Sequence, residues 1–232
     1  MPARAAAAAL LAALGALHAS TVLAAPPAPP AGLAAVDLEA LTSTELRDRI
    51  AHGTTTVLVP IGGTEQNGAH MILGKHNVRA HVLADRIAEA LGNAVVAPTL
   101  AYVPEGSIHP PAAHMKYTGT ISIPEPVFEG LLESAARSFK QHGFRDVVFL
   151  GDHGGYQASL ERVAAKLDRE WAKDPACRVL ASAEYYRVTE TAYIDALKRG
   201  EDPVDARLGP NADWLSGPHQ SNLEQARGHM VF

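Results

Sequence analysis

The sequence predicts an α/β fold, a three-layer α/β/α sandwich with a mostly parallel central sheet. Short apolar runs rich in β-branched residues alternate along the chain with helical segments, a pattern typical of a parallel sheet covered on both faces. The 232 residues are 47% hydrophobic and 19% charged, which suits one soluble globular domain with a sizeable core. The single cysteine, Cys177, excludes an internal disulfide framework and a CxxC zinc knuckle.

The first half of the domain contains two expected strands and one expected helix. Residues 55–61 form a β-branched apolar run, which predicts a buried strand. Residues 77–91 carry apolar side chains at helical spacing and are followed by a glycine, which predicts a helix. A second strand is expected at residues 94–100, followed by a long loop over residues 101–119.

The second half continues the alternation and is irregular from residue 200 onward. The clearest helix is expected at residues 157–171, where one face is apolar. The remaining expected elements are a short extended segment at 121–123, a helix at 125–142, strands at 146–150 and 178–183, and a helix at 189–199.

The beginning of the chain resembles an export signal rather than part of the fold. Residues 1–24 are predicted to be a signal peptide, because a short apolar run follows one arginine and small residues come next. Residues 25–36 form a Pro/Ala-rich linker, and residues 37–232 form the α/β domain. We therefore expect an exported protein, periplasmic or secreted, without a stable membrane anchor. A formal net charge of −5 and the absence of a basic run argue against nucleic acid as a partner.

Histidines gather in the three segments that are expected to follow strands. Residues 62–76, 101–119 and 151–156 together hold five of the eleven histidines, as well as Glu65 and Glu105. In a parallel sheet these segments lie at one edge, the edge where ligands bind. Imidazole and carboxylate groups together suit zinc, manganese or iron. No GxGxxG, P-loop lysine or GxSxG motif is present, which argues against a dinucleotide site, a phosphate-binding loop and a serine hydrolase. The segments therefore predict a metal site.

The same segments resemble motifs of the creatininase (creatinine amidohydrolase) family. EQNGAHMILGKH, at residues 65–76, resembles that family's EQHGPHLPLGTD, and HMKYTGTIS, at 114–122, resembles HxxFPGTIS. GDHGGY, at 151–156, resembles NGHGGN, and residues 219–224 loosely resemble HAGExE. The resemblance implies an α/β/α fold, often a homohexamer. It also implies a metal-dependent hydrolase of amide bonds in small cyclic or linear substrates.

The chain departs from these motifs at the positions that bind metal. In the family, the glutamate, histidine and aspartate of the first motif hold two metals, and the aspartate bridges them. Here Glu65 is kept, Asn67 stands at the histidine, and His76 stands at the aspartate. Gly155 and Asn222 also stand where other members have glutamates. A neutral imidazole offers one lone pair and cannot bridge two cations.

These departures lead to the hypothesis of one divalent metal per chain, held by Glu65, His76 and His153. Zinc suits this set best, and manganese and iron stay open. The remaining predicted site residues are Glu224, His219 and Glu105 for proton transfer, and His114, His70, Asn67, Gly154 and Gly155 for substrate binding.

The predicted function is hydrolysis of an amide C–N bond in a small molecule by a metal-activated water, in a homo-oligomer. Two alternatives stay open. One is a non-catalytic protein that uses the same fold to bind a ligand or a metal. The other is a metal-dependent peptidase of the same family.

Overall fold

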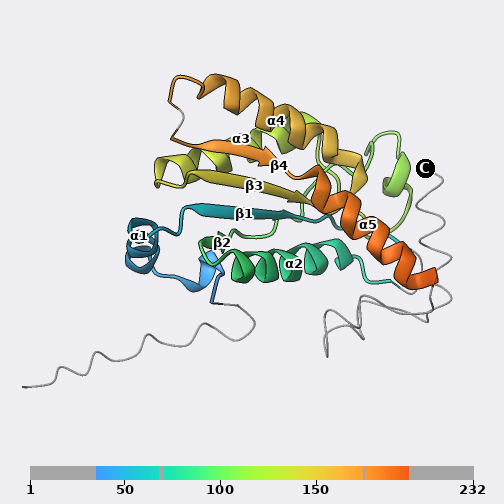
Figure 1. Ribbon diagram of the computed structural model, residues 1–232. Helices are drawn as coiled ribbons and strands as arrows, with labels where there is room; N and C mark the ends of the chain where they lie inside the picture. Colours follow the sequence, from blue (N-terminus) through green and yellow to red (C-terminus); the bar gives the residue numbers. More distant parts are fainter. Residues whose placement is uncertain (1–34, 68–70, 175, 199–232) are drawn as a thin grey trace, which may run out of the picture.

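The computed structural model describes residues 35–67, 71–174 and 176–198 (Figure 1). The predicted signal peptide lies outside these residues, as do nearly all of the predicted linker and the end of the predicted domain. None of the helices within the described ranges is both long and apolar enough to cross a membrane.

Four parallel strands form the central sheet, as predicted. They are β1 (Thr56–Ile61), β2 (Ala94–Val96), β3 (Asp146–Gly151) and β4 (Arg178–Ala181), arranged in the order β2-β1-β3-β4. The first strand pairs with β2 on one side and with β3 on the other, so it lies inside the sheet. All six residues of β1 are buried, as expected for a strand covered on both faces.

Helices cover both faces of the sheet, which confirms the three-layer prediction (Figure 1). Helices α3 (Glu125–Gln141) and α4 (Gln157–Glu170) cover one face, and α2 (Lys75–Leu91) and α5 (Ala183–Lys198) cover the other.

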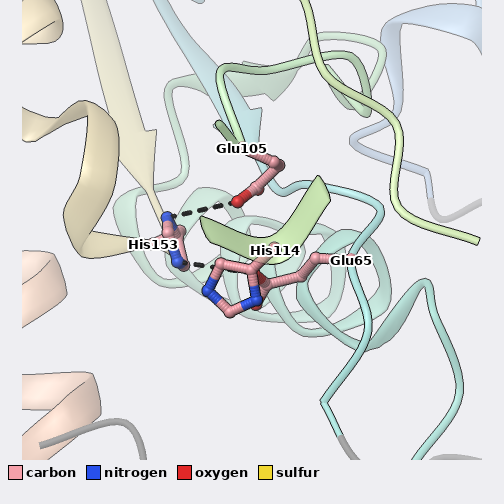
Figure 2. Close-up of side chains that lie close together, drawn as sticks. All are labelled: Glu65, Glu105, His114 and His153. Atoms are coloured by element: carbon pink, nitrogen blue, oxygen red, sulfur yellow. Dashed lines mark ion pairs between the residues drawn. The ribbon is translucent and has the colours of Figure 1, made fainter. Parts of the chain in front are cut away.

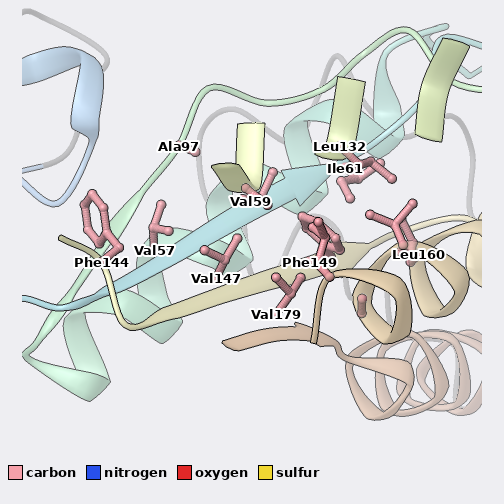
Figure 3. Close-up of a cluster of buried hydrophobic side chains, with 14 of the residues drawn as sticks. Val57, Val59, Ile61, Ala97, Leu132, Phe144, Val147, Phe149, Leu160 and Val179 are labelled. Atoms are coloured by element: carbon pink, nitrogen blue, oxygen red, sulfur yellow. The ribbon is translucent and has the colours of Figure 1, made fainter. Parts of the chain in front are cut away.

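Side chains along β1 alternate between the two faces, as the pleat of a strand requires. Val57, Val59 and Ile61 belong to the larger hydrophobic cluster under α3 and α4 (Figure 3), while Leu58 belongs to the smaller cluster under α2 and α5. Phe149 of β3, which is 0% exposed, lies in the larger cluster.

Several element boundaries differ from the predictions. The second strand ends at Val96 rather than at residue 100, because Pro98 has no N–H to donate to the ladder. One parallel bridge between Ile61 and Leu100 continues the pairing beyond it. Residues 121–123, predicted to be a short extended segment, belong to no strand of the sheet, and Ile121 N donates to Thr64 O.

Further differences lie at the two ends of the described domain. Helix α5 begins at Ala183, six residues before the predicted start at 189. The N–H of Tyr185 donates to the hydroxyl of Ser182 (3.3 Å), which therefore caps this helix. Helix α1 (Ser43–Ala51) was not predicted, although Thr42 and Glu45 form a capping box that is visible in the sequence.

Candidate metal centre

The three histidine-bearing segments meet at the carboxyl edge of the sheet, as their places after strands predict. Glu65 follows β1, and His153 follows β3. Glu105 and His114 come from the long loop after β2, in which Ala113–Lys116 form a short 3₁₀ helix. Figure 2 shows how these four side chains converge.

Glu65, Glu105, His114 and His153 form a compact group, here called the four-residue cluster. Each offers one ligand atom, and these atoms all lie within 4.8 Å of one another. Oε2 of Glu65 lies 3.0 Å from Nδ1 of His114 and 3.6 Å from Nε2 of His153. Nδ1 of His153 lies 3.9 Å from Oε2 of Glu105. Two carboxylates and two imidazoles at these distances form a suitable ligand set for a divalent metal.

Three carboxylate oxygens of the four-residue cluster are buried and accept no hydrogen bond from the described residues. They are Oε2 of Glu65 and both oxygens of Glu105. Burying a carboxylate oxygen that accepts no hydrogen bond is costly, and a bound cation would remove that cost. The donor set and these three oxygens therefore fit a metal ion.

Protonation differs from group to group in the four-residue cluster. Burial and the neighbouring Glu65 carboxylate raise the pKa of Glu105 to about 9, so its carboxyl group is protonated at pH 7 in the absence of a cation. Burial lowers the pKa of His153 to about 4, so its ring is neutral at pH 7, and neutral imidazole is the form that binds metals. Burial opposes ionisation of Glu65, but the hydrogen bond and charge of His76 outweigh it and hold the pKa of Glu65 well below its usual range.

Glycine at position 63 allows Glu105 to reach this site. The backbone of Gly63 has φ +150°, and an added Cβ would lie 2.5 Å from Oε1 of Glu105. The N–H of Glu105 donates to Oγ of Ser122 (3.0 Å), and this hydrogen bond fixes the backbone of Glu105. The glycine-rich segment after β1 therefore makes room for a carboxylate from a different loop.

A cavity of about 370 Å³ opens beside the four-residue cluster. Glu105, His114 and His153 line it, together with Gly155 and apolar side chains that include Ile123. This volume falls within the range of small-molecule sites. Three members of the four-residue cluster therefore face a space that can hold a small ligand.

The structure places His76 and Asn67 behind Glu65 rather than in the four-residue cluster. Nε2 of His76 lies 2.7 Å from Oε1 of Glu65, and its Nδ1 lies 2.8 Å from Oδ2 of Asp152. Nδ2 of Asn67 donates to the same Oε1 of Glu65 (2.8 Å). Both residues therefore contact the predicted ligand Glu65 on the side away from His114.

The two predicted glycines differ in their surroundings. Gly155 lines the cavity, and its N–H donates to Nδ1 of His153 (3.1 Å). An added Cβ at Gly154 would lie 2.8 Å from the hydroxyl of Tyr186, so Gly154 makes room for that side chain. The predicted residues His70, His219 and Glu224 lie outside the described residues.

Several site residues were missed from the sequence. Asp152 directly precedes His153 and is 1% exposed, and Arg79 holds both of its oxygens through Nε (3.0 and 2.9 Å). Burial opposes ionisation of Asp152, but the charge of Arg79 followed by the hydrogen bond of His76 keeps its pKa low. Nζ of Lys75 donates to Oδ1 of Asn67 (2.8 Å), and burial lowers its pKa to about 7.

The positions of Arg79 and Asp152 in the sequence indicate that each lies near a predicted ligand. Arg79 comes three residues after His76, a spacing that places both side chains on one face of a helix. Asp152 lies in the same glycine-rich segment as His153. What the sequence does not contain is the contact between these two segments.

Tyr156 joins the ends of β1 and β3 beneath the site. Its hydroxyl accepts from the N–H groups of Asp152 and His153, both at 3.1 Å. It also lies 2.7 Å from the carbonyl oxygen of Ile61 and 2.6 Å from that of Gly62. The side chain is completely buried, so water cannot replace these bonds.

Replacing Tyr156 with phenylalanine is therefore expected to lower the free energy of unfolding by about 1–3 kcal/mol, since buried polar groups lose their partner. Urea denaturation followed by circular dichroism measures the change. Tyr102→Phe is the matched control, because that side chain is 59% exposed and its loss of a hydroxyl leaves stability unchanged. Equal stability of both variants would contradict a structural role for the Tyr156 hydroxyl.

Comparisons with known proteins agree with this architecture. The family model for creatininase, described as creatinine amidohydrolase, matches residues 39–227. The mycofactocin precursor peptide peptidase of Mycolicibacterium smegmatis is 36% identical over 119 residues, which cover 49% of this chain and 45% of that protein. The creatinine amidohydrolase of Pseudomonas putida is 29% identical over 120 residues, covering 52% and 45%.

A solved structure described as creatininase Mn is 25% identical, with a TM-score of 0.59, over 70% of this chain and 63% of that one. The chain spans about half the length of the curated relatives it matches. Because the family model covers most of the chain, including all four members of the four-residue cluster, this protein belongs to the creatininase family.

Proposed function

We propose that this protein is a metal-dependent hydrolase that cleaves an amide C–N bond. The observation that carries the proposal is the set of three buried carboxylate oxygens, without hydrogen bonds, facing two imidazoles beside a cavity. The relatives named above support it, since one is named an amidohydrolase and another a peptidase.

Within this proposal Glu65, His114 and His153 hold the metal, and Glu105 moves the proton. The three ligands converge on one point, because both imidazoles approach the same oxygen of Glu65. Two histidines and a glutamate form a ligand combination known for catalytic zinc, and manganese or iron is also compatible. A divalent cation bound there supplies Lewis acidity, which lowers the pKa of a water molecule to about 7 and polarises a carbonyl group.

Glu105 is the best-placed group for proton transfer. It lines the cavity, and neither of its oxygens is engaged in a hydrogen bond with the described residues. A bound cation nearby would lower the pKa of Glu105, and the ionised carboxylate would then accept a proton from the attacking water and return it to the leaving nitrogen. Gly155 has no side chain, so the cavity wall beside His153 leaves space for the substrate.

The proposed substrate is a small cyclic or linear amide, which suits a cavity of about 370 Å³. A peptide is the second candidate. It is favoured by the similarity to the mycofactocin precursor peptide peptidase of Mycolicibacterium smegmatis, which is 36% identical over 119 residues. Parallel assays with cyclic amides, acyclic amides and short peptides distinguish a small amide substrate from a peptide substrate.

Removing the metal is expected to abolish hydrolysis, and adding zinc or manganese is expected to restore it. Metal content is measured by mass spectrometry on the same samples as activity, using the full chain. Glu170→Gln is the control: this exposed carboxylate pairs with Arg137 on the surface and should change neither reading. Hydrolysis that persists in metal-free protein would contradict the proposal. Bound metal without hydrolysis of any substrate would favour the non-catalytic alternative.

Export and assembly are parts of the same proposal that rest on the sequence. We infer that residues 1–24 direct the chain to the periplasm or medium, and that it forms a homo-oligomer. N-terminal sequencing of protein recovered from the medium or periplasm tests the first, and sedimentation analysis tests the second. Retention of the full leader inside the cell, or a monomer at all concentrations, would count against them.

A further inference from the structure

A chain of buried hydrogen bonds runs behind Glu65, away from the four-residue cluster. Arg79 binds both carboxylate oxygens of Asp152, and Oδ2 of Asp152 lies 2.8 Å from Nδ1 of His76. Nε2 of His76 in turn lies 2.7 Å from Oε1 of Glu65. The exposed fractions are 4% for His76, 1% for Asp152 and 0% for Glu65. This chain is therefore shielded from water along most of its length.

Both ring nitrogens of His76 contact charged side chains. One nitrogen faces a carboxylate oxygen of Glu65 and the other faces one of Asp152. Nη2 of Arg79 also lies 3.4 Å from Nδ1 of His76. These contacts hold the ring behind Glu65, away from the four-residue cluster. In this arrangement His76 supports Glu65.

Asn67 supplies the second donor to the same oxygen of Glu65. Its Nδ2 donates to Oε1 at 2.8 Å, and its Oδ1 accepts from Nζ of Lys75 at 2.8 Å. The amide orientation follows from the contact with Glu65, because an ionised carboxylate can only accept. Oε1 of Glu65 thus receives two hydrogen bonds, and Oε2 is left to face His114.

From these contacts we propose that His76, Asp152 and Arg79 form a positioning relay that makes Glu65 bind through Oε2 alone and limits the centre to one metal ion. The inference rests on the proposed function, since it assumes that Glu65 is a ligand. The contacts of His76 and Asn67 occupy the Oε1 side of Glu65, where a second ion would bind. The cationic side chain of Arg79 repels a second cation there as well.

The first test measures metal stoichiometry and coordination in the full-length protein loaded with zinc. We expect one zinc per chain. X-ray absorption at the zinc edge should show two imidazole ligands in the wild type and still two in His76→Ala. Zinc affinity should fall about 10–100-fold in His76→Ala, as for other residues that orient a metal ligand. His76→Gln keeps one amide donor and should lose less affinity. His142→Ala, at the exposed end of α3, is the matched control and should leave affinity unchanged.

The second test uses the wild type and does not depend on whether a variant folds. Nitrogen nuclear magnetic resonance of the cadmium-loaded protein should show metal–nitrogen coupling for the rings of His114 and His153 and none for the ring of His76, whose signals are assigned by their absence in His76→Gln. Coupling to the ring of His76 would make it a ligand. Asp152→Asn should weaken zinc binding without changing the imidazole count, because it disturbs the relay and not the ligands.

The outcomes separate this inference from the proposed function. A wild type that binds no zinc overturns the proposed function. One zinc in the wild type together with the loss of an imidazole in His76→Ala overturns only the relay and makes His76 a ligand. Two zinc ions per chain overturn the limit to one metal. One zinc, an unchanged imidazole count and weaker binding in His76→Ala support the inference.

Discussion

Glu65→Gln is expected to reduce the metal content from about one equivalent per chain to almost none, and to abolish hydrolysis with it. The substitution keeps the shape of the side chain but removes the negative charge that the two nearest imidazoles face. A metal site needs deprotonated ligands, and a neutral amide is a much weaker one. Metal content and hydrolysis of the best amide substrate are measured on the same preparation.

Glu105→Gln is the matched comparison for this variant. Both glutamates are buried in the four-residue cluster and have oxygens that accept no hydrogen bond from the described residues, but only Glu65 lies close to both histidine ligands. We expect Glu105→Gln to keep its metal and to lose about 10²–10⁴-fold in kcat, the usual contribution of a general acid or base. Loss of metal in Glu105→Gln would make Glu105 a fourth ligand. Full metal content in Glu65→Gln would contradict the proposed centre.

Phe149→Ala is expected to lower the free energy of unfolding by about 3–5 kcal/mol, the usual cost of removing a buried aromatic ring. Phe149 is 0% exposed and belongs to the larger cluster, between the sheet and helices α3 and α4 (Figure 3). The sheet holds the neighbours of Phe149 in place, so they can close only part of the cavity that the substitution leaves. That loss is a large share of the about 5–15 kcal/mol that stabilises an ordinary domain. Urea denaturation at equilibrium measures it.

The control for Phe149→Ala is Leu91→Ala. Leu91 is the last residue of α2 and is 53% exposed, so its truncation should change the free energy of unfolding by less than about 0.5 kcal/mol. A loss below about 1 kcal/mol in Phe149→Ala would show that this position does not lie in a tightly packed core.

Secondary structure could be predicted where the local pattern and the tertiary environment agree. The run at residues 55–61 is β-branched and apolar, and β1 is buried on both faces. The prediction failed at the end of β2, where a proline interrupts pairing, and at α1, where a capping box was overlooked. The predicted start of α5 is too late because residues 182 and 183, the cap and the first residue of the helix, were included in the predicted strand at 178–183, whereas β4 ends at Ala181.

Candidate site residues that the sequence places after strands lie together in the structure. Glu65 and His153 follow β1 and β3, and both lie in the four-residue cluster. His76 was predicted to be a ligand because it stands at a family ligand position, and the structure places it between two carboxylates. Asp152 is one of those carboxylates and lies 76 residues from His76 in the chain. No local pattern could reveal that contact.

The sequence by itself determined the alternation of strands and helices, and hence a parallel sheet with histidine-bearing loops along one edge. The tertiary structure decided which of those side chains contact the same carboxylate group. The strand order β2-β1-β3-β4 places the ends of β1 and β3 next to each other, so Glu65 meets His153 and the pair formed by His76 and Asp152. The physical reason is that ligand geometry, burial and protonation depend on neighbours in space, whereas a sequence pattern reports only neighbours along the chain.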